Sequence, residues 1–159
     1  MPLRRSQITM TDAELQKFLD EERVLTCATI GPGDRPHLMP LWYVVGKGLI
    51  TAWTFAKSQK VRNLERVPKA TLQVEAGRDR YGELRGAMLE CDVEIVRDPA
   101  TVEAIGLAIA RRYPGLPRGA ETSPERRAQV VKQVPKRVVL RFIPTRVVSW
   151  DHRKLCAAD

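Results

Sequence analysis

The sequence contains few of the residues that build metal centres or disulfide frameworks. Its 159 residues include three cysteines and two histidines. Cys27, Cys91 and Cys156 lie far apart and form no CxxC or Cys/His spacing of the kind that binds zinc. An odd number of scattered thiols is typical of a reducing compartment, so we expect a cytoplasmic protein without a metal ion.

Long apolar runs are absent as well. Arg4 and Arg5 are not followed by the apolar segment of a signal peptide, and no later run approaches the length of a membrane span. Neither His37 nor His152 belongs to a recognisable Ser/His/Asp or Cys/His signature. We therefore expect a soluble protein that is not a hydrolase, and the catalytic residues stay unassigned.

Negative charge is under-represented. The chain has 27 Lys and Arg against 19 Asp and Glu, which gives a formal net charge of +8. Such an excess attracts an anionic partner, such as a nucleic acid, a phosphorylated cofactor or an acidic surface. The cations are scattered, without the block of like charges that is typical of a nucleic-acid-binding arm, and this pattern favours local anion sites.

The hydrophobic pattern predicts a mainly β chain that forms one domain over 1–159. Alternating apolar residues predict strands at 24–30, 37–45, 49–55, 69–75, 89–95 and 138–142, with a last strand at 146–150 after a break at Pro144. Capping residues and apolar spacing predict helices at 11–22, 58–67, 99–113 and 123–134. We expect an antiparallel β-barrel of about six strands with helices at its edges.

Residues 53–64 are the most informative stretch, because a strand there runs into a helix with cations at the junction. Free N–H groups at a helix N-terminus, together with Lys57, Ser58 and Lys60, would complete a phosphate site. On the charge pattern alone, Lys57, Lys60 and Arg62 also fit the commoner case of a solvated helix face.

Two aromatic residues precede this junction. Trp53 and Phe55 alternate with Thr54 and could flank a planar ring, with the threonine hydroxyl between them. Packing in the core is the alternative explanation for both aromatic side chains.

These motifs resemble the pyridoxamine 5'-phosphate oxidase-like family of flavin-binding split β-barrels over nearly the whole chain. In that family an aromatic-Thr pair leads into a Ser-x-Lys turn that binds the cofactor phosphate, matched here by Trp53-Thr54 and Ser58-Gln59-Lys60. The resemblance implies that the strand around Pro40, Leu41 and Trp42 lines the ring. It also implies a homodimer with two cofactor sites at its interface, which the C-terminal Trp150 reaches.

Within this family the chain most resembles the branch of reductases that use coenzyme F-420, a deazaflavin with a phosphate and an acidic glutamate tail. Lys57 and Arg62 beside the phosphate site would suit that tail. The resemblance thus implies hydride transfer between F-420 and a small electron-poor substrate. Residues 151–153 read Asp-His-Arg, where true pyridoxamine 5'-phosphate oxidases carry Arg-x-His, so oxidation of vitamin B6 is not expected.

Three alternatives stay open. The same fold could use FMN as an oxidase or reductase, and only the identity of the ring would differ. It could also hold a flavin-type cofactor without catalysis, because fold does not determine function. Nucleic-acid binding rests only on the basic charge and interleaved aromatics, and it is not favoured.

Overall fold

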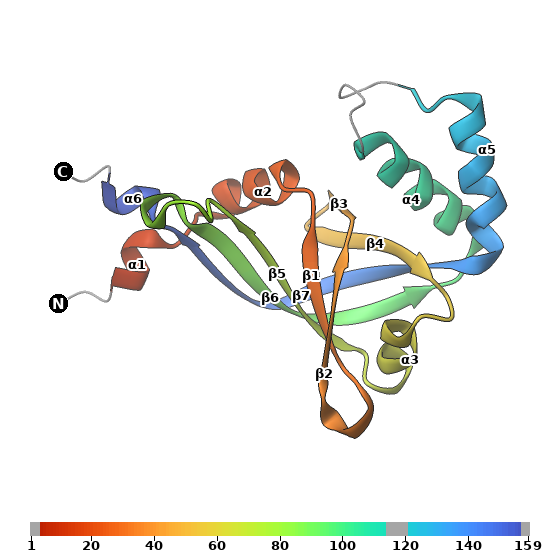
Figure 1. Cartoon of the computed structure of the whole chain (residues 1–159), viewed down its shortest axis with the longest axis horizontal. Coiled ribbons are helices and arrows are strands. Elements are labelled where there is room, and N and C mark those ends of the chain that lie inside the picture. The colour runs from red at the N-terminus through yellow and green to blue at the C-terminus, as the bar shows by residue number, and fades with distance from the viewer. Residues whose placement is uncertain (1–3, 114–120, 157–159) are drawn as a thin grey trace.

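The computed structural model describes residues 4–113 and 121–156. It contains one seven-stranded antiparallel sheet in the order β2-β1-β5-β6-β7-β4-β3. The strands are β1 (Leu25–Ile30), β2 (Pro36–Leu41), β3 (Tyr43–Gly46), β4 (Leu49–Phe55), β5 (Lys69–Ala76), β6 (Arg85–Val96) and β7 (Arg137–Asp151). The sheet is strongly curled, with β1 and β2 crossing the direction of β6 and β7 (Figure 1). The mainly β, split-barrel fold expected from the sequence is confirmed.

The strand count is seven because the apolar run at 37–45 divides at Trp42. β2 pairs with β1, whereas β3 pairs with β4 at the other end of the strand order. Leu41 therefore lies opposite Leu25, and Tyr43, two residues later, lies opposite Ala52. The chain passes from one edge strand straight to the other at this point, which brings the two edges of the curled sheet together.

Strand β7 is also longer than expected, since it continues through Pro144. The pairing of β6 with β7 shifts register between Glu90 and Cys91, where Cys91 lies opposite Pro144 and Glu90 lies opposite Arg146. Proline has no N–H to donate to a ladder, and a bulge is one of the places where a sheet tolerates it. The predicted break is therefore wrong, and the irregularity is absorbed within one strand.

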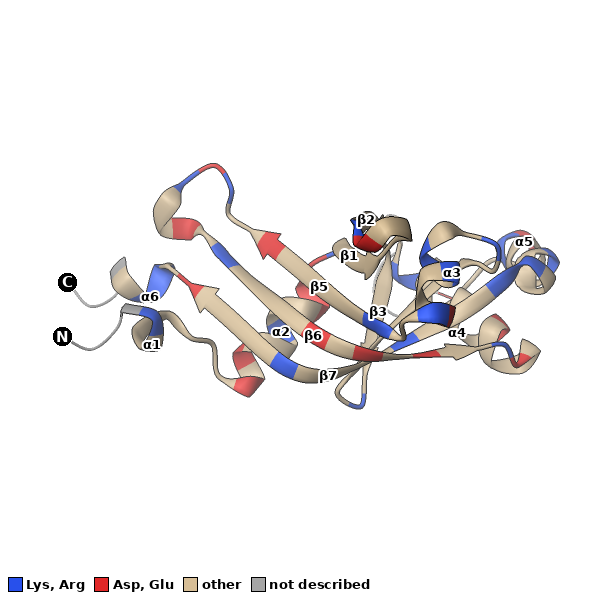
Figure 2. Cartoon of the chain, turned by 90° about the horizontal axis from the view of Figure 1, so that it is seen from below, with Lys and Arg blue, Asp and Glu red and all other residues tan. Residues whose placement is uncertain are grey.

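The helices lie around the sheet rather than inside it. They are α1 (Arg4–Ile8), α2 (Asp12–Glu21), α3 (Gln59–Arg66), α4 (Pro99–Arg112), α5 (Pro124–Gln133) and α6 (Arg153–Cys156), with short 3-10 segments at Pro32–Asp34, Tyr81–Glu83 and Val134–Lys136. Helix α2 begins with a capping box between Thr11 and Glu14. α1 and α6 lie side by side at one end of the molecule, and α4 and α5 lie at the other (Figures 1 and 2). In the described residues, no helix combines the length and apolar character needed to cross a membrane.

The core fills the concave side of the curled sheet. Its largest fully buried side chains include Phe18 of α2, Tyr43 of β3 and Phe142 of β7. Burying such a side chain contributes roughly 1.5–3 kcal/mol. The hydroxyl of Tyr43 donates to the Leu19 carbonyl at 2.6 Å, so the core also fixes the end of α2 against β3.

Candidate functional site

The junction between β4 and α3 contains an unsatisfied polar atom. Ser58 is the N-cap of α3, with extended backbone angles, but its side chain makes no capping hydrogen bond. Its Oγ is buried and has no partner among the described residues. A buried hydroxyl that forgoes the usual bond to its own helix leaves both itself and the first N–H groups of α3 free for a ligand.

Lys60 is buried beside this junction. The residue is 8% exposed, and its Nζ donates to Thr54 Oγ1 at 3.1 Å. Burial lowers the pKa of this ammonium group. None of the ion pairs in the described part of the chain includes Lys60. The site therefore contains a partly desolvated cation that no carboxylate neutralises.

The other predicted residues of the junction divide into two groups. Gln59 has a structural role. Its Nε2 donates to Asn63 Oδ1 at 2.8 Å, and Asn63 Nδ2 in turn donates to Thr29 Oγ1 at 3.0 Å. This chain of bonds ties α3 to β1 and holds the helix N-terminus in place. Lys57 and Arg62 are exposed. Lys57 and Arg62 therefore behave as ordinary solvent-exposed residues around the start of a surface helix, whereas Lys60 does not.

A cavity of about 470 Å³ lies between the sheet and helices α4 and α5. Most of its lining is apolar: Val24, Pro40, Leu41, Trp42, Trp53, Thr54, Gly106, Ile109, Ala110, Val130 and Arg137. It thus brings together five of the predicted residues: Pro40, Leu41, Trp42, Trp53 and Thr54. Thr54, one of the lining residues, accepts from Lys60 Nζ on the face of β4 opposite to Trp53, so the cation lies behind the cavity wall and does not line the cavity.

Two packing features shape the cavity wall. The ring of Trp42 stacks on that of Tyr113, with centroids 4.6 Å apart and planes inclined by 6°. Arg112 fixes the end of α4 by donating to the carbonyls of Leu19 and Tyr43, each at 3.0 Å. Helix α4 is therefore held against both α2 and β3.

Gly106 lets α4 approach the sheet. A Cβ added to this glycine would lie 3.0 Å from Cε2 of Trp53 and 2.9 Å from Cγ1 of Val130. The missing side chain therefore sets how closely Trp53 packs beneath the helix. The indole Nε1 of Trp53 is buried and, within the described residues, has no partner.

The expected arrangement of Trp53, Thr54 and Phe55 is wrong in one respect. Successive residues of a strand point to opposite faces, so buried Thr54 faces away from the two aromatics. The guanidinium of Arg137 lies over both rings instead, 4.4 Å from the Trp53 centroid and 3.5 Å from that of Phe55. Sequence analysis missed Arg137. The residue is placed here by its pairing opposite Phe55, and the sequence does not show which strands pair.

Trp150 is not brought to the cavity within one chain. It lies near the end of β7, opposite Gly86, whereas Arg137 begins the same strand. The separation along an extended strand is roughly 40 Å. Trp150 packs on Gly86, where an added Cβ would lie 2.4 Å from the indole Cζ2. Any contact between Trp150 and a cofactor would therefore need a second copy of the chain.

Comparison with known proteins identifies a matching family and several similar structures. The family model described as "Pyridoxamine 5'-phosphate oxidase" matches residues 11–151. The crystal structure of the conserved hypothetical protein Rv2991 from Mycobacterium tuberculosis is 40% identical, with a TM-score of 0.86, and the match covers 96% of this chain and 91% of that chain. The comparison with curated proteins found no match.

Two more distant structures share the fold. An F420 reductase is 23% identical, with a TM-score of 0.61 over 83% of this chain and 94% of that chain. An FAD-binding protein from Mesorhizobium loti is 17% identical, with a TM-score of 0.65 over 89% of this chain and 94% of that chain. At these identities the likeness concerns the fold alone.

Proposed function

Because the chain belongs to the pyridoxamine 5'-phosphate oxidase family, we propose that it is an oxidoreductase that binds a phosphorylated flavin-type cofactor. The observation that carries this proposal is that the start of α3 contains both a buried Ser58 Oγ without a partner and a buried Lys60 ammonium that no described carboxylate neutralises. Both groups can donate to a phosphate, and the helix N-terminus adds free N–H groups. The residues present thus fit the anionic part of such a cofactor.

The apolar cavity fits the ring of the same cofactor. Trp42 and Trp53 offer flat aromatic surface and Leu41 adds aliphatic surface, and the Nε1 of Trp53, which has no partner among the described residues, can donate to a ring heteroatom. When bound, the ring supplies hydride transfer, while the protein contributes binding, orientation and exclusion of water. α4 and α5 shield one side of this cavity, which keeps water from the reacting centre.

We propose coenzyme F-420 as the cofactor, with FMN as the alternative. Lys57 and Arg62 are exposed next to the phosphate site, and none of the ion pairs among the described residues includes them. Two free cations at this position suit the acidic glutamate tail of F-420, which FMN lacks. A small electron-poor molecule would accept the hydride.

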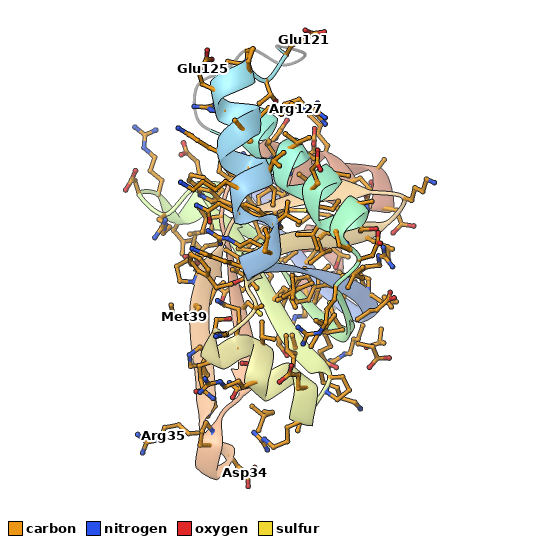
Figure 3. All side chains as sticks on the ribbon, turned by 90° about the vertical axis from the view of Figure 1, so that its right-hand side faces the viewer. Asp34, Arg35, Met39, Glu121, Glu125 and Arg127 are labelled. Atoms are coloured by element: carbon orange, nitrogen blue, oxygen red, sulfur yellow. The ribbon has the colours of Figure 1, made fainter. Side chains whose placement is uncertain are left out.

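We also propose that the active form is a homodimer. The β1–β2 hairpin projects from the sheet, with Asp34 and Arg35 at its tip and Met39 further along β2 (Figure 3). Leu38 and Met39 are 58% and 42% exposed on opposite faces of β2, so this edge strand presents an apolar side chain on each face that a second copy could cover. A second copy could also bring its Trp150 to the cavity. Light scattering should give twice the mass of the chain.

The test is a titration of the purified protein with F-420 and with FMN, followed by cofactor fluorescence. We expect F-420 to bind more tightly, and Lys60→Met to weaken both cofactors roughly 10- to 100-fold, because both have a phosphate. Lys69→Met is the control: it removes an exposed lysine from β5 and should change neither the affinity for F-420 nor that for FMN. Binding of neither cofactor, or equal binding by Lys60→Met and the native protein, would contradict the proposal.

A companion experiment separates the two cofactors and tests turnover. The double change Lys57→Gln with Arg62→Gln should weaken F-420 several-fold and leave FMN nearly unchanged, since only F-420 has the acidic tail. A reduced cofactor that binds but is not oxidised by any electron-poor acceptor would instead indicate a cofactor-holding protein.

A further inference from the structure

Arg137 differs from the other arginines that the sheet places near acidic side chains. Arg141 and Arg146 of the same strand pair with Glu94 and Glu90, at 2.7 and 2.8 Å. Arg85 of β6 pairs with glutamates of α2 and its C-cap. Arg137 forms no ion pair in the described part of the chain, although burial lowers its pKa and so opposes its charge.

The guanidinium of Arg137 is nevertheless held in one orientation. Its Cζ lies over the rings of Trp53 and Phe55, and its Nε and Nη2 donate to Gln133 Oε1 at 3.2 and 3.0 Å. Within the described residues, Nη1 has no acceptor. A planar donor that is fixed by stacking and by a neutral amide is preorganised for an anion that the chain itself does not supply.

The cavity defines what else the ligand must be. Among the described residues, Arg137 is the one charged residue that lines it, and the indole of Trp53 is the polar group on the same face of β4. Thr54 also contributes to the lining, but its hydroxyl accepts from Lys60 on the opposite face. The remaining lining is aliphatic or aromatic, and Leu41, Ile109 and Val130 contribute much of it. Lys60 is close enough to act on Arg137 electrostatically, so the positive potential here comes from two cations without a counterion.

We propose that Arg137 binds the carboxylate of a planar, mainly apolar acid held at the Arg137 side of this cavity, beside the space proposed for the cofactor ring. The inference rests on the proposed function in calling that acid the substrate, an aryl or enoyl carboxylate that accepts the hydride. The same chemistry could come from the acidic tail of F-420, and the experiment has an arm for each source. In both cases the residue acts by contact with a carboxylate.

The first arm compares 2-naphthoate with its neutral isostere 2-naphthamide, using calorimetry on the full chain with and without bound F-420. The native protein should bind the acid at least roughly tenfold more tightly than the amide, because a charge-assisted bond to Arg137 is available only to the acid. Arg137→Gln should abolish that preference. Arg141→Gln, which removes an arginine from the same strand, should retain it.

The second arm measures F-420 and FMN affinities of Arg137→Gln. Loss of F-420 affinity alone, with the naphthoate preference unchanged, overturns the binding of an apolar acid by Arg137 and assigns Arg137 to the acidic tail of the cofactor. Equal binding of acid and amide by the native protein, or no change in either arm on Arg137→Gln, overturns the proposal.

Folding of the variant is checked by thermal denaturation. Where Arg137→Gln does not fold, Arg137→Lys keeps the charge but loses the planar fork, and it should show a reduced preference for the acid. The preference of the native protein for the acid over the amide is also measured without cofactor, so this result does not depend on the proposed function. Failure of both cofactors to bind would remove the proposed function and leave the Arg137 result intact.

Discussion

The two ends of the molecule treat their buried charges in opposite ways. At the end where α1 and α6 meet, hereafter the terminal end, Asp151 is 7% exposed and accepts two bonds from the Arg153 guanidinium, at 2.8 and 2.6 Å. At the end covered by α4 and α5, hereafter the cavity end, Lys60 is buried and Arg137 is partly buried, and neither pairs with a carboxylate in the described part of the chain. Charge that the chain neutralises serves the fold, and charge left unneutralised indicates a ligand.

The terminal end is therefore expected to matter for stability and not for binding. Arg153→Ala should lower the free energy of unfolding by about 2 kcal/mol, because it leaves the buried Asp151 carboxylate without its charged partner. Chemical denaturation measures this loss, and the affinity for F-420 should not change. Arg146→Ala removes an exposed partner of Glu90 and should cost no more than about 0.5 kcal/mol.

The same pair predicts a dependence on pH. The Arg153 guanidinium lowers the pKa of Asp151 below its ordinary value of 3.8. Its folded pKa is thus depressed, so the stabilisation is present above pH 3.8 and is lost as the pH falls through the folded pKa. Between pH 5 and pH 2, the free energy of unfolding should fall more in the native protein than in Arg153→Ala. An equal fall in both proteins would contradict a lowered pKa of Asp151 caused by Arg153.

The cavity end is expected to show the opposite behaviour. Lys60→Met should raise the stability of the cofactor-free protein by about 1 kcal/mol, because an apolar chain of similar length replaces an unneutralised buried cation. Thermal denaturation without cofactor measures this gain. A destabilised Lys60→Met would mean that its bond to Thr54 is structural, and the contrast between the two ends would fail.

The smallest expected effect concerns the packing of α4. Gly106→Ala gains helix propensity but places its Cβ about 3 Å from Trp53 and Val130. The gain in helix propensity and the cost of crowding oppose each other, and the free energy of unfolding should fall by about 0.5 kcal/mol. Because Trp53 must shift toward the cavity, ligand affinity should fall a few-fold. Ala104→Gly, in the same helix and away from the cavity lining, should lose stability without a change in affinity.

The sequence predicts the fold and the buried Ser58 Oγ and Lys60 of the candidate phosphate site better than it predicts Arg137 of the cavity. Ser58 and Lys60 follow from local spacing, because a strand, an N-cap and a short helix are contiguous in the chain. Local charge could not separate buried Lys60 from exposed Lys57 and Arg62, since burial depends on how α3 packs against β1. Arg137 could not be assigned, because its place beside Trp53 depends on strand pairing between distant segments.

The same limit explains the three errors in the sheet. The break expected at Pro144 does not occur, because pairing with β6 absorbs the proline at a register shift. The division at Trp42 follows from closure of the curled sheet, which joins β2 and β3 to different neighbours. Thr54 faces away from Trp53 because successive residues of a strand alternate between its two faces. Each error concerns long-range pairing or the face of a strand, and none concerns the type of element.

The most direct test is a crystal structure of the protein with F-420 bound. We predict that the cofactor phosphate lies within hydrogen-bonding distance of Lys60 Nζ and Ser58 Oγ, with the ring in the cavity beside Leu41 and Trp53. A phosphate bound at the terminal end, beside Arg153 or Arg85, would contradict the claim that unneutralised cations mark the ligand site.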